Sequence, residues 1–369
     1  MIQRAPIPLR RKLLYLGFVT LVMLGLAEAG LRARAWFKYG GTASVRDPML
    51  TFDRAAGIYV PTPGYELKGR NIHIKINSLG FRGEEISREK PPGTFRIVCL
   101  GASTTFSSEV SSNQKTWTHQ LQEKLRAAFP GRPIEVVNAA VGGYVAADNL
   151  KRLKHHVLPL DPDLVIYYEA NNEIVKDTQA LAIERGLLAP GGGRQPSWVT
   201  SLSKVSLMFD LAYKNLAIIA RSRDDSTAKI DKIPKNLPER FIGTLDEMRA
   251  MLAERKVPLV LSTFVVKYRR DQDRATQIAN ADVAFYYMPW MSIDGMLDAM
   301  DRYNQAIMDY GKRVGLATID DRQAIPADSE HFTDCMHLAD KGNEAMAERF
   351  YRGLRTLKVL DSTPPSPQA

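Results

Sequence analysis

Cysteine is scarce in this chain, which contains only Cys99 and Cys335 among its 369 residues. Cys99 lies inside a strand-like run, roughly 13 Å from Ser103 at the rise of a strand, and Cys335 is expected beside the candidate active site. We therefore predict two free thiols and no structural disulfide. Histidine is also rare, with six residues, and no Cys/His spacing resembles a zinc site, so we expect no metal.

The chain also lacks the charge pattern of a nucleic-acid-binding protein. Its formal net charge is +9, but four basic residues precede the first apolar run (Arg4, Arg10, Arg11 and Lys12). Part of the net positive charge therefore indicates membrane topology, and the charge is not interpreted as a nucleic-acid-binding surface. A content of 45% apolar and 25% charged residues is ordinary for a globular protein. The length allows one large α/β domain with insertions or two smaller domains.

One long uncharged run follows the basic cluster, from Leu13 to Ala27. As a helix it spans roughly 22 Å, and extending it through residue 31 brings it close to the thickness of a bilayer. The alternative is a cleaved signal peptide, because Ala27-Glu28-Ala29 fits a small-residue cleavage site. We favour a transmembrane anchor over residues 13–31 with residues 1–12 in the cytoplasm. Both interpretations export the rest of the chain.

The composition and the hydrophobic pattern of the sequence change near residue 93. Residues 40–92 are rich in glycine, proline and short alternating runs, which predict an accessory β region. From there to residue 358, apolar runs alternate with amphipathic segments, as in a parallel sheet with helical crossovers. We predict an α/β fold with a three-layer, doubly wound, mostly parallel five-stranded sheet. The expected strands are Phe95–Leu100, Ile134–Asn138, Leu164–Tyr168, Leu259–Phe264 and Leu316–Ile319. The expected helices are Thr116–Phe129, Ala146–Val157, Glu239–Glu254, Asp294–Val314 and Asp340–Leu354, with Asp340 as an N-cap.

Two stretches interrupt this alternation. Residues 176–238 are interpreted as a lid or wall beside the site, or as a plain surface subdomain. Residues 271–293 carry aromatic side chains that line a substrate pocket or pack in the ordinary way. The tail, residues 361–369, is predicted to be disordered.

Ser103 is the candidate nucleophile. A serine hydroxyl must be presented at an exposed turn and deprotonated by a base before it can attack. Ser103 follows a strand through Gly101-Ala102, where glycine permits a tight turn. It also precedes a helix whose N-terminal amides favour a developing negative charge.

The candidate base and its orienting acid are His337 and Asp334. Their spacing of three residues places both side chains on one side of the chain, so that the carboxylate can orient the imidazole. They follow the last expected strand by a loop, which puts them at the same sheet edge as Ser103. His331 is the competing base, but on its C-terminal side only Asp334 lies at a comparable spacing.

Three donors are candidates for stabilising an oxyanion. They are the backbone amide of Ser103, the amide of Gly143 and the side chain of Asn172. Taken alone, Gly143 is also explained as a loop glycine and Asn172 as a turn former. Because each of the three follows a different expected strand, we predict that they converge.

The candidate residues and the short motifs around them resemble those of the SGNH (GDSL-like) hydrolase family. The matching blocks are GAST with Ser103, NAAVGG ending at Gly143, ANNE with Asn172, and DCMH ending at His337. The stretch NSLGFRG, residues 77–83, is similar to membrane-anchored bacterial members. The resemblance covers roughly residues 95–355 and implies an SGNH, flavodoxin-like domain.

By this resemblance Ser103, Asp334 and His337 form the triad, and Ser103, Gly143 and Asn172 form the oxyanion hole. The chain departs from the family pattern at Ala102, where an aspartate is usual. It departs again on both sides of Asn172, where Ala170 and Glu173 replace the usual glycine and aspartate. Neither departure removes a catalytic atom, so both bear on substrate preference and loop geometry.

The expected function is a serine esterase or acylhydrolase that acts on a small-molecule, lipid or glycan ester and needs no cofactor. It is expected at the bacterial inner membrane, with the catalytic domain on the periplasmic side, or secreted after signal cleavage. One alternative is an O-acetyl or acyltransferase that modifies an envelope or secreted polysaccharide. A second is an inactive glycan-binding scaffold.

Overall fold

Five parallel strands form the central sheet of the protein, in a computed structural model that describes residues 8–39, 49–189, 197–223, 229–358 and 360. The strands are β5 (Phe95–Gly101), β6 (Ile134–Asn138), β7 (Leu164–Tyr168), β8 (Leu259–Ser262) and β9 (Thr318–Ile319). Their order is β6-β5-β7-β8-β9. This confirms the predicted α/β fold with a five-stranded parallel sheet. The residues 1–7 and the tail 361–369 lie outside the described part of the chain.

The strand order creates a switch point beside β5. From β5 the chain first moves to β6 on one side and then crosses to β7 on the other, so β5 and β7 are neighbours joined by parallel pairing. In open α/β sheets, ligands bind outside the carboxyl ends of the strands at such a point. Every residue of β5 and β7 is buried, because helices cover both faces.

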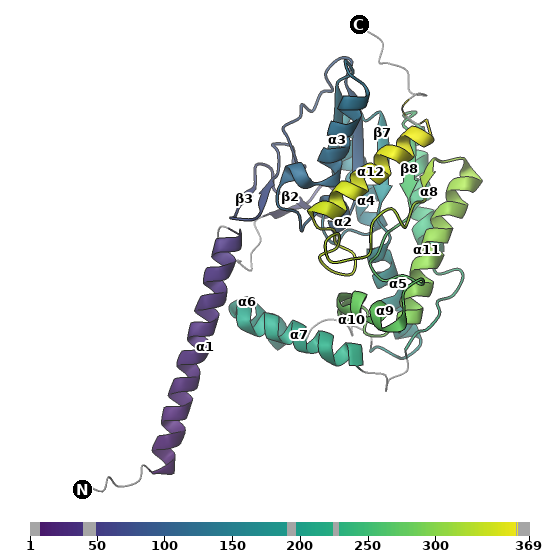
Figure 1. The fold of residues 1–369 in the computed structure, drawn as a ribbon. Coiled ribbons are helices and arrows are strands. Elements are labelled where there is room, and N and C mark those ends of the chain that lie inside the picture. Colours follow the sequence, from purple (N-terminus) through teal and green to yellow (C-terminus); the bar gives the residue numbers. More distant parts are fainter. Residues whose placement is uncertain (1–7, 40–48, 190–196, 224–228, 359, 361–369) are drawn as a thin grey trace.

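Helices cover the two faces of the sheet (Figure 1). On one face α3 (Trp117–Ala128) packs against α12 (Asp340–Thr356). The other main helices are α4 (Ala146–Arg152), α5 (Asn171–Glu184), α8 (Glu239–Ala253) and α11 (Ile293–Val314). α4 contacts α8, and α11 contacts both α5 and α8. Helices α3, α8, α11 and α12 match the predicted ones closely, whereas α4 ends at Arg152 and continues as a π-helical turn over Leu153–Val157. Helix α5 was not predicted.

The predicted N-cap at Asp340 is wrong. Ala339 occupies the N-cap position, and Asp340 is the first residue of α12. The Asp340 carboxylate instead accepts hydrogen bonds from the Ser111 amide and hydroxyl, at 2.9 and 2.6 Å. Asp340 therefore ties the start of α12 to the loop that follows the nucleophile turn, a long-range role that helix-capping rules do not foresee.

Two antiparallel hairpins precede the sheet. β1 (Leu50–Asp53) pairs with β2 (Ile58–Pro61), and β3 (Glu66–Lys68) pairs with β4 (His73–Lys75). The first hairpin packs its buried side chains against Ala102, Val141 and Tyr144. The second packs against Phe106 and Ala140. The N-terminal β region therefore supports the two loops that carry Ser103 and Gly143.

The NSLGFRG stretch contributes a buried arginine to the same support. Arg82 is 3% exposed, and its guanidinium donates to the carbonyls of Phe106 and Ser107, at 2.9 and 2.6 Å. It also donates to the Asn113 side chain at 3.0 Å. A cation is favourable at the C-terminal end of a helix, so Arg82 stabilises the short helix α2 (Ser103–Phe106).

The boundaries of the predicted insertions differ from the structure in part. Helix α5 runs to Glu184, so the interruption begins later than residue 176. It holds a hairpin of two helices, α6 (Ser197–Val205) and α7 (Leu207–Arg223). The second insertion forms α9 (Arg274–Asn280) and α10 (Asp282–Tyr287), and its Phe285 and Trp290 are buried in the main core. Packing accounts for both of these aromatic side chains.

Helix α1 (Leu9–Tyr39) stands away from the α/β body (Figure 1). Among the described residues, α1 is the only helix that is both long enough and apolar enough to cross a membrane, over Leu9–Phe37. The side chains of its apolar stretch are exposed rather than packed in the core.

Candidate active site

The nucleophile candidate stands at a sharp turn between β5 and α2. Ser103 is the first residue of α2, so its backbone amide has no partner within the helix. Gly101 makes the turn possible, because a Cβ at this position would lie 2.4 Å from the Tyr168 carbonyl oxygen and 2.3 Å from Thr105 Oγ1. The Gly101 amide donates to Asn149 Oδ1 at 3.0 Å. Ser103 is partly exposed at the carboxyl end of the sheet.

Asp334, His337 and Ser103 form a continuous chain of hydrogen bonds. His337 Nδ1 lies 2.6 Å from Asp334 Oδ2, and His337 Nε2 lies 2.8 Å from Ser103 Oγ. The other carboxylate oxygen of Asp334 accepts the amides of Met336 and His337, both at 2.8 Å. These bonds hold the carboxylate and the imidazole in one turn. His337 therefore lies within hydrogen-bond distance of both Asp334 and Ser103, although Ser103 and His337 are 234 positions apart.

The charges of the pair shift both pKa values. Burial opposes ionisation of Asp334, but hydrogen bonds from the side chain and amide of His337 and the charge of its imidazolium hold the pKa of Asp334 below its ordinary value. Burial also disfavours the imidazolium of His337. The hydrogen bond and charge of Asp334, with a further contribution from Glu109, nevertheless raise the pKa of His337 above its ordinary value. Such an imidazole is a stronger base than a free histidine.

Two of the predicted oxyanion donors lie on segments that contact each other, Gly143 on a loop and Asn172 in the first turn of α5. The Asn172 side-chain nitrogen donates to the Tyr144 carbonyl at 2.9 Å, which leaves the second N–H of this amide available. Gly143 adopts a φ of +82°, a conformation that favours glycine. A Cβ at Gly142 would lie 4.0 Å from the Ser103 Cβ, so the glycine loop passes beside the nucleophile.

Glu169 and Glu173 position the start of α5 and the segment after Gly143, and these roles were not predicted. Glu169 Oε1 accepts the Asn172 amide at 2.5 Å, and Glu173 Oε1 accepts the amide of Ala146 at 2.6 Å. Burial raises the pKa of Glu169 to about 8, so this carboxyl is mostly protonated at neutral pH. The sequence does carry one signal, since an acidic residue directly follows the buried run LVIYY.

The competing base, His331, has an acidic partner that the sequence analysis overlooked. His331 Nδ1 lies 2.8 Å from Asp328 Oδ1, on the N-terminal side. The chain therefore contains two Asp-x-x-His pairs. The one at Asp334 and His337 is the pair that contacts Ser103.

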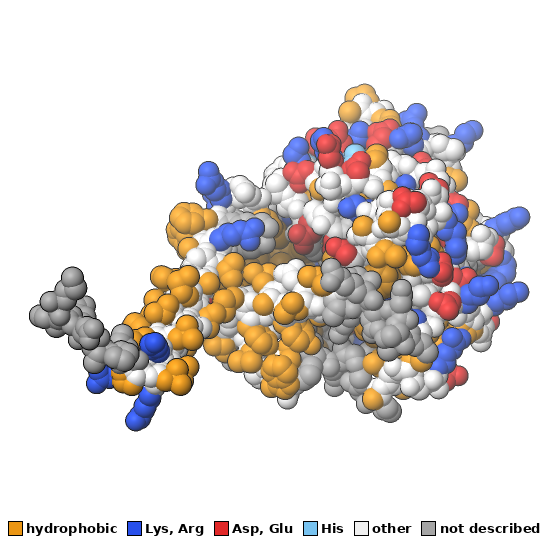
Figure 2. Space-filling view, turned by 60° about the horizontal axis from the view of Figure 1, so that its bottom comes forward, with side chains coloured by type: hydrophobic (Ala, Val, Ile, Leu, Met, Phe, Trp, Pro, Cys, Tyr) orange, Lys and Arg blue, Asp and Glu red, His pale blue; other side chains and the backbone are white. Residues whose placement is uncertain are grey.

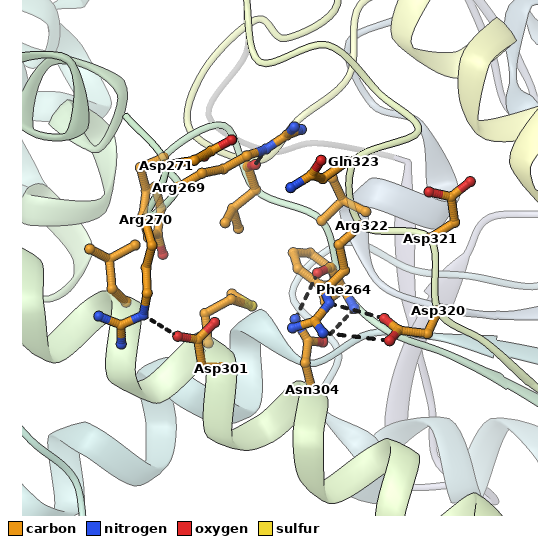
Figure 3. Close-up of a pocket in the computed structure, with 15 residues that line it drawn as sticks. Phe264, Arg269, Arg270, Asp271, Asp301, Asn304, Asp320, Asp321, Arg322 and Gln323 are labelled. Atoms are coloured by element: carbon orange, nitrogen blue, oxygen red, sulfur yellow. Dashed lines mark hydrogen bonds and ion pairs between the residues drawn. The ribbon is translucent and has the colours of Figure 1, made fainter. Parts of the chain in front are cut away.

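The remaining candidates for a site are less specific. Within the described ranges, no group of three or more His, Cys, Asp or Glu side chains could hold a metal ion. A pocket of about 510 Å³ opens beyond the ends of β8 and β9, beside α11 (Figure 3). Its charged side chains pair with one another, as in the contacts of Arg270 with Asp301 and of Arg322 with Asp320. None of the predicted catalytic residues lines this pocket.

Comparison with known proteins identifies one family. The model of the GDSL-like Lipase/Acylhydrolase family matches residues 99–345, a range that includes Ser103, Gly143, Asn172, Asp334 and His337. No curated protein matches the chain.

Several solved structures are similar at low sequence identity. LAE5, an alpha/beta hydrolase enzyme from the metagenome of Lake Arreo, Spain, is 18% identical with a TM-score of 0.44, covering 71% of this chain and 96% of that one. The lipase/acylhydrolase from Enterococcus faecalis is 17% identical with a TM-score of 0.43, covering 74% and 100%. Axe2, an acetylxylan esterase from Geobacillus stearothermophilus, is 14% identical with a TM-score of 0.42, covering 70% and 94%.

Proposed function

The chain belongs to the GDSL-like lipase/acylhydrolase family of ester-hydrolysing enzymes, and on that premise we propose that Ser103, His337 and Asp334 form its catalytic triad. One observation carries this proposal. The hydrogen-bond chain from Asp334 Oδ2 through both ring nitrogens of His337 to Ser103 Oγ has distances of 2.6 and 2.8 Å. A nucleophile, a base and an orienting acid in this order are the requirement for acyl transfer through serine.

The mechanism follows from the geometry. His337 Nε2 takes the proton of Ser103 Oγ as the oxygen attacks the ester carbonyl, and Asp334 stabilises the resulting imidazolium. The Ser103 and Gly143 amides and the Asn172 side chain stabilise the oxyanion. His337 then protonates the leaving alcohol. In the second half, His337 activates a water molecule that attacks the acyl-serine, which releases the acid and regenerates Ser103.

Asn172 is the donor whose removal is easiest to interpret. We expect Asn172→Ala to lower kcat for a p-nitrophenyl ester by about 10²- to 10³-fold with little change in KM, because the donor acts mainly on the charge of the transition state. Asn236→Ala is the matched control, since Asn236 is exposed on a turn before α8. Steady-state kinetics of both variants check the prediction. A loss confined to KM would contradict a role in the oxyanion hole.

The pH dependence of hydrolysis should report the raised pKa of His337. Only the neutral imidazole can accept the Ser103 proton, so kcat/KM should rise with pH through a value above the ordinary histidine pKa of 6.5. Glu109→Gln removes one of the charges that raise this pKa. We expect it to move the acid limb to lower pH by about a few tenths of a unit at low salt.

Glu89→Gln is the control for that shift, because Glu89 is also an exposed carboxylate and is not among the groups that shift the pKa of His337. Profiles of kcat/KM against pH for the three proteins give the comparison. An acid limb below pH 6.5 in the unsubstituted protein would contradict the assignment of His337 as the base. An acid limb that Glu109→Gln leaves in place would contradict the contribution of Glu109 to this pKa.

We also propose that the enzyme is anchored in the bacterial inner membrane by residues 13–31, with the accessory region 40–92 and the catalytic domain 93–358 on the periplasmic side. Helix α1 supplies the required length and apolar surface. The basic residues Arg10, Arg11 and Lys12 precede the apolar run, and positive residues favour the cytoplasmic side. The ester substrate is then met outside the cytoplasm.

A further inference from the structure

The helical hairpin α6–α7 is bound to α1 through one partly buried carboxylate. Glu28 of α1 accepts hydrogen bonds from the Leu207 and Met208 amides, at 3.0 and 2.9 Å, and from the Ser206 hydroxyl at 2.9 Å. These are donors at the N-terminal end of α7, where a negative charge is favourable. Arg32 completes the contact, with its Nε 2.7 Å from Glu28 and its Nη2 2.6 Å from the Val205 carbonyl.

This contact lies directly beyond the apolar run of α1, close to the outer edge of the hydrocarbon layer. Glu28 directly follows the apolar run that begins at Leu13, so it lies roughly 22 Å along the helix from the start of that run. The hydrocarbon core of a bilayer is about 30 Å thick. A carboxylate this close to the apolar layer is costly unless it is paired. The N-terminus of α7 and Arg32 provide this pairing, which fixes the hairpin at the level of the outer interface.

The hairpin exposes a continuous apolar face. Trp198, Leu202 and Val205 of α6 are spaced four and three residues apart, which places them on one side of the helix, and they are 59%, 45% and 70% exposed. On α7, Leu216 and Ile219 are 66% and 48% exposed. In Figure 2 hydrophobic side chains gather side by side on α1 and on the adjacent hairpin.

The same hairpin connects to the proposed active site. Helix α7 runs from α1 beneath the α/β body and packs against α10 (Figure 1). Tyr287 of α10 lies within electrostatic reach of both Lys214 of α7 and Asp334, and its pKa is raised mainly by burial. The hairpin therefore links α1 to α10, the helix whose Tyr287 faces the charge of Asp334.

We propose that the exposed face of α6–α7 lies in the outer leaflet of the membrane that α1 spans. The occupant is lipid rather than protein because the face is continuous with the apolar surface of α1, meets it at the interfacial level, and carries a tryptophan, a residue enriched at membrane interfaces. Amphipathic helices of this kind bury their apolar face in the headgroup and acyl boundary. The proposal rests on the membrane anchoring inferred above. It implies that the active site works at the membrane surface.

Depth-dependent quenching of single probes tests this placement. The full chain is reconstituted in phosphatidylcholine nanodiscs with or without doxyl-labelled lipid, and an environment-sensitive fluorophore is attached at Leu202→Cys or Leu216→Cys. Cys99 and Cys335 are fully buried, and the unsubstituted protein measures any labelling of them. Lys204→Cys is the matched control on α6, because Lys204 is exposed and residues two apart in a helix do not share a face. Val19→Cys reports α1 itself.

The expected result is strong quenching by the lipid at Val19, Leu202 and Leu216, at least about twofold greater than at Lys204. Quenching at Val19 with none at Leu202 and Leu216 would overturn the hairpin placement and leave the anchor intact. No quenching at Val19 would overturn the anchor itself. Equal quenching at Leu202 and Lys204 would also overturn the proposal, because the lipid contact would then not follow the apolar face. Circular dichroism of each labelled variant confirms that it is folded.

Discussion

Replacing Ser103 with alanine should lower kcat for ester hydrolysis by about 10⁴-fold or more. The substitution removes the oxygen that His337 Nε2 contacts at 2.8 Å and leaves binding and the oxyanion donors in place. Residual turnover then depends on water attacking the ester directly. The protein should remain folded, since the Ser103 side chain is partly exposed and its hydroxyl bonds only the imidazole among the contacts of the described residues.

A fluorophosphonate probe makes the same experiment independent of the unknown substrate. The probe should label the full chain at Ser103, identified by peptide mapping, and labelling should disappear in both Ser103→Ala and His337→Ala. Ser108→Ala is the control in the same loop and should retain labelling. If a folded Ser103→Ala protein keeps its activity or its label, the nucleophile lies elsewhere. If the unsubstituted, folded protein shows neither, the inactive glycan-binding scaffold becomes the better interpretation.

Gly101→Ala should produce a large loss of stability, because Gly101 leaves no room for a side chain at the nucleophile turn. The new Cβ would lie 2.4 Å from the Tyr168 carbonyl oxygen and 2.3 Å from Thr105 Oγ1. Thr105 can rotate, but the Tyr168 carbonyl belongs to β7 and pairs in register with Gly101, so relief requires opening the β5–β7 edge. We expect the free energy of unfolding to fall by about 3 kcal/mol and hydrolysis to fall with it, because Ser103 stands on this turn.

Gly243→Ala provides the matched comparison. Gly243 lies within helix α8, and a Cβ there meets nothing within 4 Å. Alanine is a better helix former, so this variant should gain about 0.5–1 kcal/mol. Unfolding of the detergent-solubilised full chain by urea or heat measures both changes. A Gly101→Ala protein as stable and as active as the unsubstituted one would show that the nucleophile turn tolerates a side chain.

Local pattern was sufficient for the elements of the fold. The buried strand β7 is an uninterrupted apolar run, β5 is broken only by Arg96, and the helices between them repeat apolar residues at helical spacing, so these elements were predicted nearly to their ends. The family blocks around Ser103, Gly143, Asn172 and His337 were visible for the same reason, since each is a short contiguous motif. The catalytic roles of these residues stay predictions until they are measured.

Local sequence patterns could not predict the contacts between segments that are distant in the chain. The carboxylate of Asp340 fits an N-cap by local rules, yet it bonds Ser111 because α12 packs across the nucleophile loop. Residues 176–184 carry too weak a periodicity to be distinguished from a loop, and tertiary packing extends α5 through them. Glu169 and Arg82 gain their roles only from groups that the fold brings to them.

The fold class, the family motifs and the apolar N-terminal segment can be recognised from the amino-acid sequence, because each depends on neighbouring residues. The folded chain was needed to establish that β5 lies between β6 and β7, that His337 reaches Ser103 across 234 positions, and that Glu28 holds the hairpin α6–α7 against α1. Strand order and side-chain pairing depend on how separate segments share one core. That information is distributed over the whole chain and becomes readable once the chain is folded.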